Sequence, residues 1–113
     1  MIKQRCQYQT EFADGIFTVR LCGEIDHHSA VNIRTSLDEE ICRLQPKKMI
    51  LDLGSIEFMD SSGLGLIMGR YSLMQKLGGV LTLKNPNERI VRIFELANLG
   101  RMISIEKSEE ETK

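Results

Sequence analysis

The chain has 113 residues, of which 42% are hydrophobic and 27% are charged, with 15 Lys and Arg residues against 16 Asp and Glu residues. These values are typical of one folded domain and exclude a disordered or fibrous chain. The formal charge of -1 leaves no cationic excess, so we expect no direct binding to nucleic acid or to an anionic membrane.

No apolar run approaches the roughly 20 residues that span a bilayer, and the first residues do not resemble a signal peptide. We therefore expect a cytoplasmic protein with no membrane partner. The three cysteines, Cys6, Cys22 and Cys42, are odd in number and widely spaced, which is typical of thiols in a reducing compartment. We assign them no chemistry and expect no cofactor.

The chain opens with the pattern of an antiparallel hairpin. Residues 7–12 alternate in character, and residues 16–22 are rich in β-formers. Between them, Asp14-Gly15 is a strong signal for a two-residue turn. We therefore predict two antiparallel strands at the start of the fold.

Helix and strand patterns alternate through the middle of the chain. Apolar residues recur at steps of three and four over 30–44, which predicts a helix that ends before Pro46. The apolar run at 49–53 predicts a central strand covered by helices on both faces. A second helix is predicted from Asp60 or Ser61 to residue 77, where two glycines follow.

The last third continues the alternation with a strand over 80–83 and a third helix. Asn85 and Pro86 look like the N-cap and first-turn proline of that helix, and Glu88 looks like the acid of a capping box. Residues 103–105 are predicted as a short edge strand, followed by a polar tail that is solvated or a frayed helix.

The resulting element order is β-β-α-β-α-β-α-β. Strands that alternate with helices pair in parallel through right-handed crossovers, so we predict an α/β fold with a mixed β-sheet: an antiparallel N-terminal hairpin, then βαβα units with helices packed on the sheet. We expect residues 1–113 to form a single domain, with 107–113 as its tail.

The most unusual segment is Phe58-Met59-Asp60-Ser61-Ser62-Gly63-Leu64-Gly65. It places two hydroxyls and a carboxylate where a helix begins, and an anion at a helix N-terminus gains about 0.3–1 kcal/mol. A phosphoryl group would therefore be tolerated there. The simpler interpretation is that Asp60 or one serine only caps the helix, and the residues alone do not distinguish Ser61 from Ser62.

This segment, the earlier Gly23-Glu24-Ile25-Asp26-His27-His28 and the later Gly69-Arg70-Tyr71 together resemble the anti-sigma factor antagonists of spore-forming bacteria, a family with the STAS fold. The resemblance extends over nearly the whole chain. Asp26-His27-His28 together with Gly69-Arg70-Tyr71 resembles the sporulation member more narrowly, whereas Asp-Ser-Ser-Gly-Leu-Gly is shared by many STAS antagonists.

The resemblance implies a regulator that is not an enzyme. It implies that Ser61 is phosphorylated by an anti-sigma factor that is itself a serine kinase, that this modification abolishes binding, and that a serine phosphatase reverses it. The unmodified form would bind the anti-sigma factor and release the sigma factor. The residues implied in partner binding are Glu24, Asp26, His27, Ser29, Met59, Asp60, Ser62, Gly63 and Leu64.

Four alternatives remain open at this point. Within the family, the chain could instead serve a general-stress sigma factor. A nucleophilic constellation could use Ser61 or Ser62 with His27 or His28 and Asp26 or Asp60, but no Gly-x-Ser-x-Gly elbow is present. A receiver domain could be phosphorylated on Asp52 at the end of the central strand. A metal site at His27-His28 lacks a third ligand at a suitable spacing.

Overall fold

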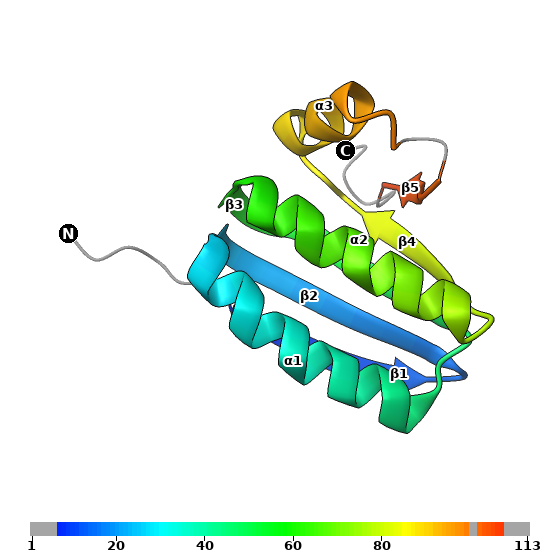
Figure 1. Ribbon diagram of the computed structural model, residues 1–113. Coiled ribbons are helices and arrows are strands. Elements are labelled where there is room, and N and C mark those ends of the chain that lie inside the picture. The colour runs from blue at the N-terminus through cyan, green and yellow to red at the C-terminus, as the bar shows by residue number, and fades with distance from the viewer. Residues whose placement is uncertain (1–6, 100–101, 108–113) are drawn as a thin grey trace.

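The computed structural model describes residues 7–99 and 102–107, and its elements follow the predicted order. The strands and helices are, in chain order, β1 Gln7–Ala13, β2 Ile16–Ile25, α1 His27–Leu44, β3 Lys48–Met59, α2 Ser61–Lys76, β4 Val80–Lys84, α3 Glu88–Leu96 and β5 Ser104–Glu106. The strands form one sheet in the order β1-β2-β3-β4-β5 (Figure 1). The predicted mixed α/β architecture is confirmed.

The predicted hairpin forms at Asp14 and Gly15, whose φ angles of 55° and 80° are those of a tight two-residue turn. It pairs β1 with β2 in the antiparallel sense, and the other strand pairs are parallel. After α2, Gly78 adopts a φ of 81°, which ends the helix as predicted. Turn residues therefore fix two of the places where the chain reverses at this end of the sheet.

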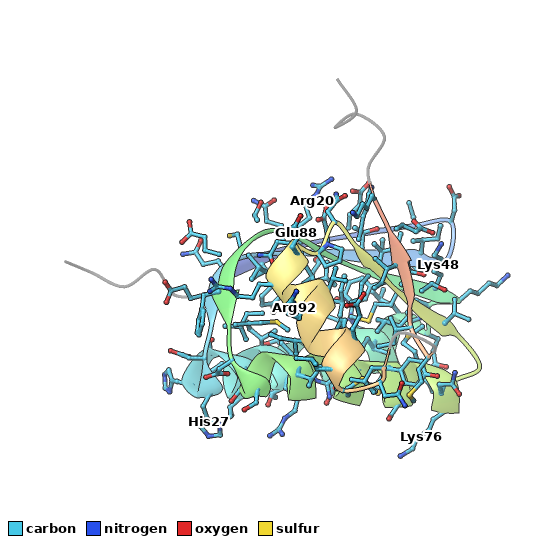
Figure 2. The ribbon with its side chains drawn as sticks, turned by 90° about the horizontal axis from the view of Figure 1, so that it is seen from above. Arg20, His27, Lys48, Lys76, Glu88 and Arg92 are labelled. Carbon is cyan, nitrogen blue, oxygen red and sulfur yellow. The ribbon has the colours of Figure 1, made fainter. Side chains whose placement is uncertain are left out.

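The helices α1 and α2 cover only one face of the sheet, so the prediction of helices on both faces is wrong (Figure 1). Along β3, Met49 and Leu51 are buried against the helices, whereas Ile50 and Asp52 are partly exposed on the opposite face. That face also carries Arg20, which lies 3.7 Å from Asp52. Figure 2 shows Arg20 on the sheet side of the molecule and His27 and Lys76 on the helix side.

An ion pair between a buried guanidinium and a partly exposed carboxylate joins the two helices. The guanidinium Nε of Arg70, on α2, lies 2.9 Å from a carboxylate oxygen of Asp38, on α1, and the Arg70 side chain is only 6% exposed. Burial lowers the pKa of Arg70, and nearby Asp38 opposes that shift while Arg34 adds to it. The pair fixes the two helices side by side, because separating it would leave a guanidinium in the protein interior.

Several boundaries differ from the sequence prediction. β2 continues to Ile25 and β3 continues to Met59, so both strands run further toward α1 and α2 than the apolar runs indicated. The N-cap of α3 is Asn87, which accepts a hydrogen bond from the Ile90 N–H at 2.9 Å. Asn85 instead has a φ of 58°, so it belongs to the turn before the helix.

No helix in the described part of the chain is long and apolar enough to cross a membrane. The predicted edge strand is present as β5, shifted by one residue to Ser104–Glu106. Of the predicted tail, residues 108–113 lie outside the described residues, as does Cys6.

Candidate functional site

The candidate site lies at the carboxyl end of the parallel strands, where β2 leads into α1 and β3 leads into α2 (Figure 1). Ile25 and Met59, the last residues of the two strands, are paired in the sheet. The Asp60 N–H donates to the Ile25 carbonyl at 3.3 Å. The starts of the two helices are therefore held together by the sheet itself, in the position where open α/β sheets place their functional groups.

At the start of α2, the Asp60 carboxylate is used as a cap. Its Oδ1 accepts a hydrogen bond from the Ser62 N–H at 2.8 Å, which satisfies one of the free donors of the first turn. Ser61 is the first residue of the helix and is exposed, and the hydrogen bonds of the described residues do not include its hydroxyl. Asp60 therefore orders the turn while the Ser61 hydroxyl faces solvent.

At the start of α1, Asp26 and Ser29 form a reciprocal capping box. The Asp26 carboxylate accepts from the Ser29 N–H at 2.9 Å, and the Ser29 hydroxyl oxygen accepts from the Asp26 N–H at 3.0 Å. Ser29 is only 7% exposed. Its hydroxyl is thus committed to the helix start, which leaves His27 as an exposed polar group at this terminus.

A shallow groove of about 220 Å³ lies between the first turns of the two helices. Its lining includes His27, Val31 and Arg34 from α1 and Ser62 and Leu66 from α2. The groove therefore presents apolar surface together with an imidazole and a guanidinium, directly beside the exposed Ser61.

The structure brings the residues implied in phosphorylation and partner binding to one end of the molecule but in different environments. His27 and Ser61 are exposed, and the half-buried members are Glu24, Asp26, Asp60, Ser62 and Leu64. Ser29, Met59 and Gly63 are buried. A side chain at Gly63 would lie 2.9 Å from Cβ and Sδ of Met59, so this glycine is where α2 packs closely on the end of β3.

Sequence reasoning missed two exposed apolar residues at this end of the molecule. Phe58, near the end of β3, is 42% exposed, and Val31, on α1 beside the groove, is 39% exposed. The predicted strand ended at residue 53, so the prediction did not say on which face of the sheet the Phe58 side chain would lie. A strand pattern extended through Met59 would have placed Phe58 on the face opposite the buried Met59.

The structure removes the basis of the receiver alternative, because Asp52 does not end its strand. It lies within β3, which continues to Met59. Its carboxylate accepts from the Gly54 N–H at 3.0 Å and lies 3.7 Å from Arg20 on the helix-free face. As for a metal site, residues 7–99 and 102–107 contain no group of three or more His, Cys, Asp or Glu side chains placed to hold an ion.

The comparison with known families matches the STAS domain over residues 7–112, and the chain therefore belongs to the STAS-domain family. The anti-sigma F factor antagonist of Paenibacillus polymyxa is 38% identical over 91% of this chain and 88% of its own length. The anti-sigma-B factor antagonist of Bacillus subtilis is 35% identical over 81% of this chain and 83% of its own length.

Solved structures agree with this assignment. The anti-sigma factor antagonist SpoIIAA in its unphosphorylated form is 31% identical, with a TM-score of 0.79 over 94% of this chain and 92% of that one. The phosphorylated form of the Bacillus SpoIIAA is also 31% identical, with a TM-score of 0.75 over 94% and 96%. Within the family, the chain is thus one of the anti-sigma factor antagonists, which are non-enzymatic regulators, and the predictions of family, fold and class are confirmed.

Proposed function

We propose that this chain is a phosphorylation-controlled antagonist with Ser61 as its switch. The unphosphorylated form binds an anti-sigma factor and releases the sigma factor, and phosphorylation of Ser61 abolishes that binding. The observation that carries the proposal is the exposed Ser61 hydroxyl at the first residue of α2, beside a groove between two helix starts.

The physical reason for the switch is electrostatic. Phosphorylation adds a charge of about -1.5 to -2, next to the Asp60 carboxylate that caps α2. In an interface, one like-charge contact at about 4 Å costs about 4 kcal/mol at an effective dielectric of about 20. Because about 1.4 kcal/mol is a tenfold change in affinity, one such contact would lower partner binding roughly a thousandfold.

The fold itself should tolerate the phosphate. The N-terminus of α2 stabilises a nearby anion by about 0.3–1 kcal/mol, which favours a local effect over a refolding. The likeness of this chain to both forms of SpoIIAA, with TM-scores of 0.79 and 0.75, supports the same view. The modification would therefore block the contact surface and leave the domain intact.

Two other proteins complete the proposed cycle. The anti-sigma factor acts as the serine kinase and uses ATP, so the site on this chain is its substrate. A phosphoserine ester is chemically persistent, so a dedicated serine phosphatase restores the active form. Sigma factors act with RNA polymerase, and we therefore place the whole cycle in the cytoplasm.

The proposed partner-binding residues divide by exposure. Direct contact is expected from His27, Ser61 and the half-buried side chains of Glu24, Asp60 and Leu64. The half-buried Asp26 and Ser62 also border this surface and hold the helix starts in place. The buried residues Ser29, Met59 and Gly63 contribute by shaping the surface on which those contacts are made.

We infer a sigma F partner system, with the sigma B class as the second candidate. The sigma F relative has the higher identity and coverage, 38% over 91% of this chain against 35% over 81%. His27 and His28, which first suggested the sporulation member, are exposed and therefore available for partner recognition. Arg70, from the other suggestive segment, is 5% exposed and serves packing between helices.

The deciding experiment incubates the chain with ATP and either purified anti-sigma F factor or anti-sigma B factor, then maps the modified residue by mass spectrometry. We expect acid-stable phosphate on Ser61, lost in Ser61→Ala and retained in Ser62→Ala, with the faster reaction for anti-sigma F factor. Phosphate on Ser62, or an acid-labile acyl phosphate on Asp52, would refute the assignment.

A further inference from the structure

Phe58 is an exposed aromatic residue at the same end of the molecule as Ser61. It is 42% exposed and pairs in the sheet with Glu24 of β2, on the face that carries no helix. A single exposed apolar side chain is common on protein surfaces and by itself indicates nothing. Its place in the fold, and not its exposure alone, distinguishes Phe58 from other exposed apolar residues.

Phe58 lies on an extension of the sheet. Within the described residues, β4 pairs with β3 only as far as Asp52 and Lys84. Beyond that point β3 pairs with β2 alone up to Met59, and its β4 side is contacted by Asn87, whose side-chain amide donates to the Ile56 carbonyl at 3.4 Å. The last residues of β3 therefore extend beyond the part of the sheet that pairs with β4, and β2 and Asn87 hold their backbone.

The extension is continuous with the start of α2. Met59 beneath it is buried at 3% exposure, and the next residue, Asp60, donates its N–H to Ile25 at 3.3 Å. Phe58 and Ser61 are three residues apart, so their Cα atoms are separated by at most about 11 Å. A standard interface covers about 800 Å² on each partner, which is wide enough to include both residues.

We propose that Phe58 is an apolar anchor that inserts into an apolar pocket of the anti-sigma factor when that protein docks over Ser61. This inference rests on the proposed function. Aromatic side chains near the centre of an interface commonly supply a large part of its binding energy. Phe58 supplies apolar contact on the sheet side of Ser61, while Val31 supplies it on the helix side, beside the groove.

The chain offers a matched control in Phe12. This residue is also a strand phenylalanine, is 43% exposed, and pairs with Phe17 near the hairpin. Along β2, Phe17 lies seven positions before Glu24, the partner of Phe58, which corresponds to about 23 Å at about 3.3 Å per residue. Phe12 therefore lies far from the Ser61 surface.

The test compares Phe58→Thr and Phe12→Thr, because threonine retains a high strand propensity. Affinity of the unphosphorylated proteins for anti-sigma F factor is measured by calorimetry, with Ser61→Asp as the reference for lost binding. We expect Phe58→Thr to weaken binding about ten- to hundredfold and Phe12→Thr to leave it unchanged. In the kinase reaction, Phe58→Thr should raise KM with little change in kcat, because the lost contact stabilises the bound substrate and the transition state equally.

Other outcomes separate this inference from the proposed function. If the wild-type chain binds and Ser61→Asp does not, but both threonine variants bind like wild type, the anchor is refuted and the switch stands. If the wild-type chain binds no anti-sigma factor, both are refuted. Should Phe58→Thr unfold, two other variants replace it: Phe58→Leu, which retains a smaller apolar side chain, and Phe58→Lys, which removes the apolar end. If both are folded and bind the anti-sigma factor with unaltered affinity, the inference is overturned.

Discussion

The two long helices begin in closely related ways but use their serines differently. Each has an aspartate as its N-cap, Asp26 for α1 and Asp60 for α2. In α1 the fourth residue of the sequence Asp-His-His-Ser is Ser29, whose buried hydroxyl closes a capping box with Asp26. At the start of α1, the serine hydroxyl is therefore used within the cap.

In α2 the corresponding position is Gly63, which has no side chain and lies against Met59. The cap consists of Asp60 and the Ser62 N–H, so Ser61 is not needed to form the helix and remains exposed. Under the proposed function, the hydroxyl that the kinase would phosphorylate is the one that the cap of α2 does not use.

The largest expected effect tests this difference directly. Ser61→Asp should weaken binding to the anti-sigma factor roughly a thousandfold, because one like-charge contact in an interface costs about 4 kcal/mol at an effective dielectric of about 20. Ser61→Asn has nearly the same size without the charge and should retain most of the affinity. Equal affinities of the Asp and Asn variants in a calorimetric titration would show that charge is not the cause.

The element order, the hairpin, both long helices and the Asp60–Leu64 segment could all be predicted from the sequence, because turn residues and apolar spacing act locally. The exposed face of the sheet could not, since Ile50 makes β3 look apolar on both sides. The last residues of β3 were also missed. Gly54 and Ser55 interrupt the strand pattern, and the pairing there depends on a distant segment, β2, with shifted register.

The sequence predicted where the candidate site lies, but the prediction left out several details of it. Nothing in the residues alone distinguished Ser61 from Ser62, because both follow a capping aspartate. The fold separates them: the Ser62 side chain lines the groove and Ser61 faces solvent. The capping role of Ser29 and the exposure of Phe58 depend on which way each side chain points once the helix and strand have formed.

The second prediction concerns the ion pair between Asp38 and Arg70, which joins the middle parts of α1 and α2. Asp38→Asn would leave the Arg70 guanidinium buried without its counter-charge, and breaking a fully buried pair costs about 3–5 kcal/mol. Asp38 is 39% exposed, so water reduces the penalty, and we expect a loss of about 2 kcal/mol in the free energy of unfolding by urea. The exposed pair of Arg43 with Glu40 is the control, since Glu40→Gln should change stability by about 0.5 kcal/mol or less.

The double variant Asp38→Asn with Arg70→Met checks the reason for that loss. Replacing the guanidinium by an apolar side chain removes the uncompensated charge, so part of the stability should return. Two results would show that the ion pair does not hold the helices together. One is an Asp38→Asn protein as stable as Glu40→Gln. The other is a double variant whose loss in the free energy of unfolding exceeds the sum of the losses in the two single variants.

The third prediction adds a methyl group at Gly63, the position in α2 that corresponds to Ser29 in α1. Gly63→Ala would place a Cβ 2.9 Å from Met59, and such overpacking costs about 1–3 kcal/mol. Better helix propensity returns about 1 kcal/mol, which leaves a net loss of about 1 kcal/mol in the free energy of unfolding. At Gly69 a Cβ would meet nothing within 4 Å beyond its neighbours and its own helix backbone, so Gly69→Ala should instead stabilise the protein. Stabilisation by both changes would show that the close approach to Met59 is not the reason for a glycine at position 63.

The smallest expected effect separates structure from recognition at Ser29. Ser29→Ala removes the acceptor of the Asp26 N–H, and loss of a capping interaction costs about 1 kcal/mol. Because the hydroxyl is buried in the cap, affinity for the anti-sigma factor should change less than stability does. Ser72→Ala, at an exposed position within α2, should leave both quantities nearly unchanged. A Ser29→Ala protein that melts like wild type but binds its partner tenfold more weakly would make Ser29 a contact residue and would remove the distinction between the two helix starts.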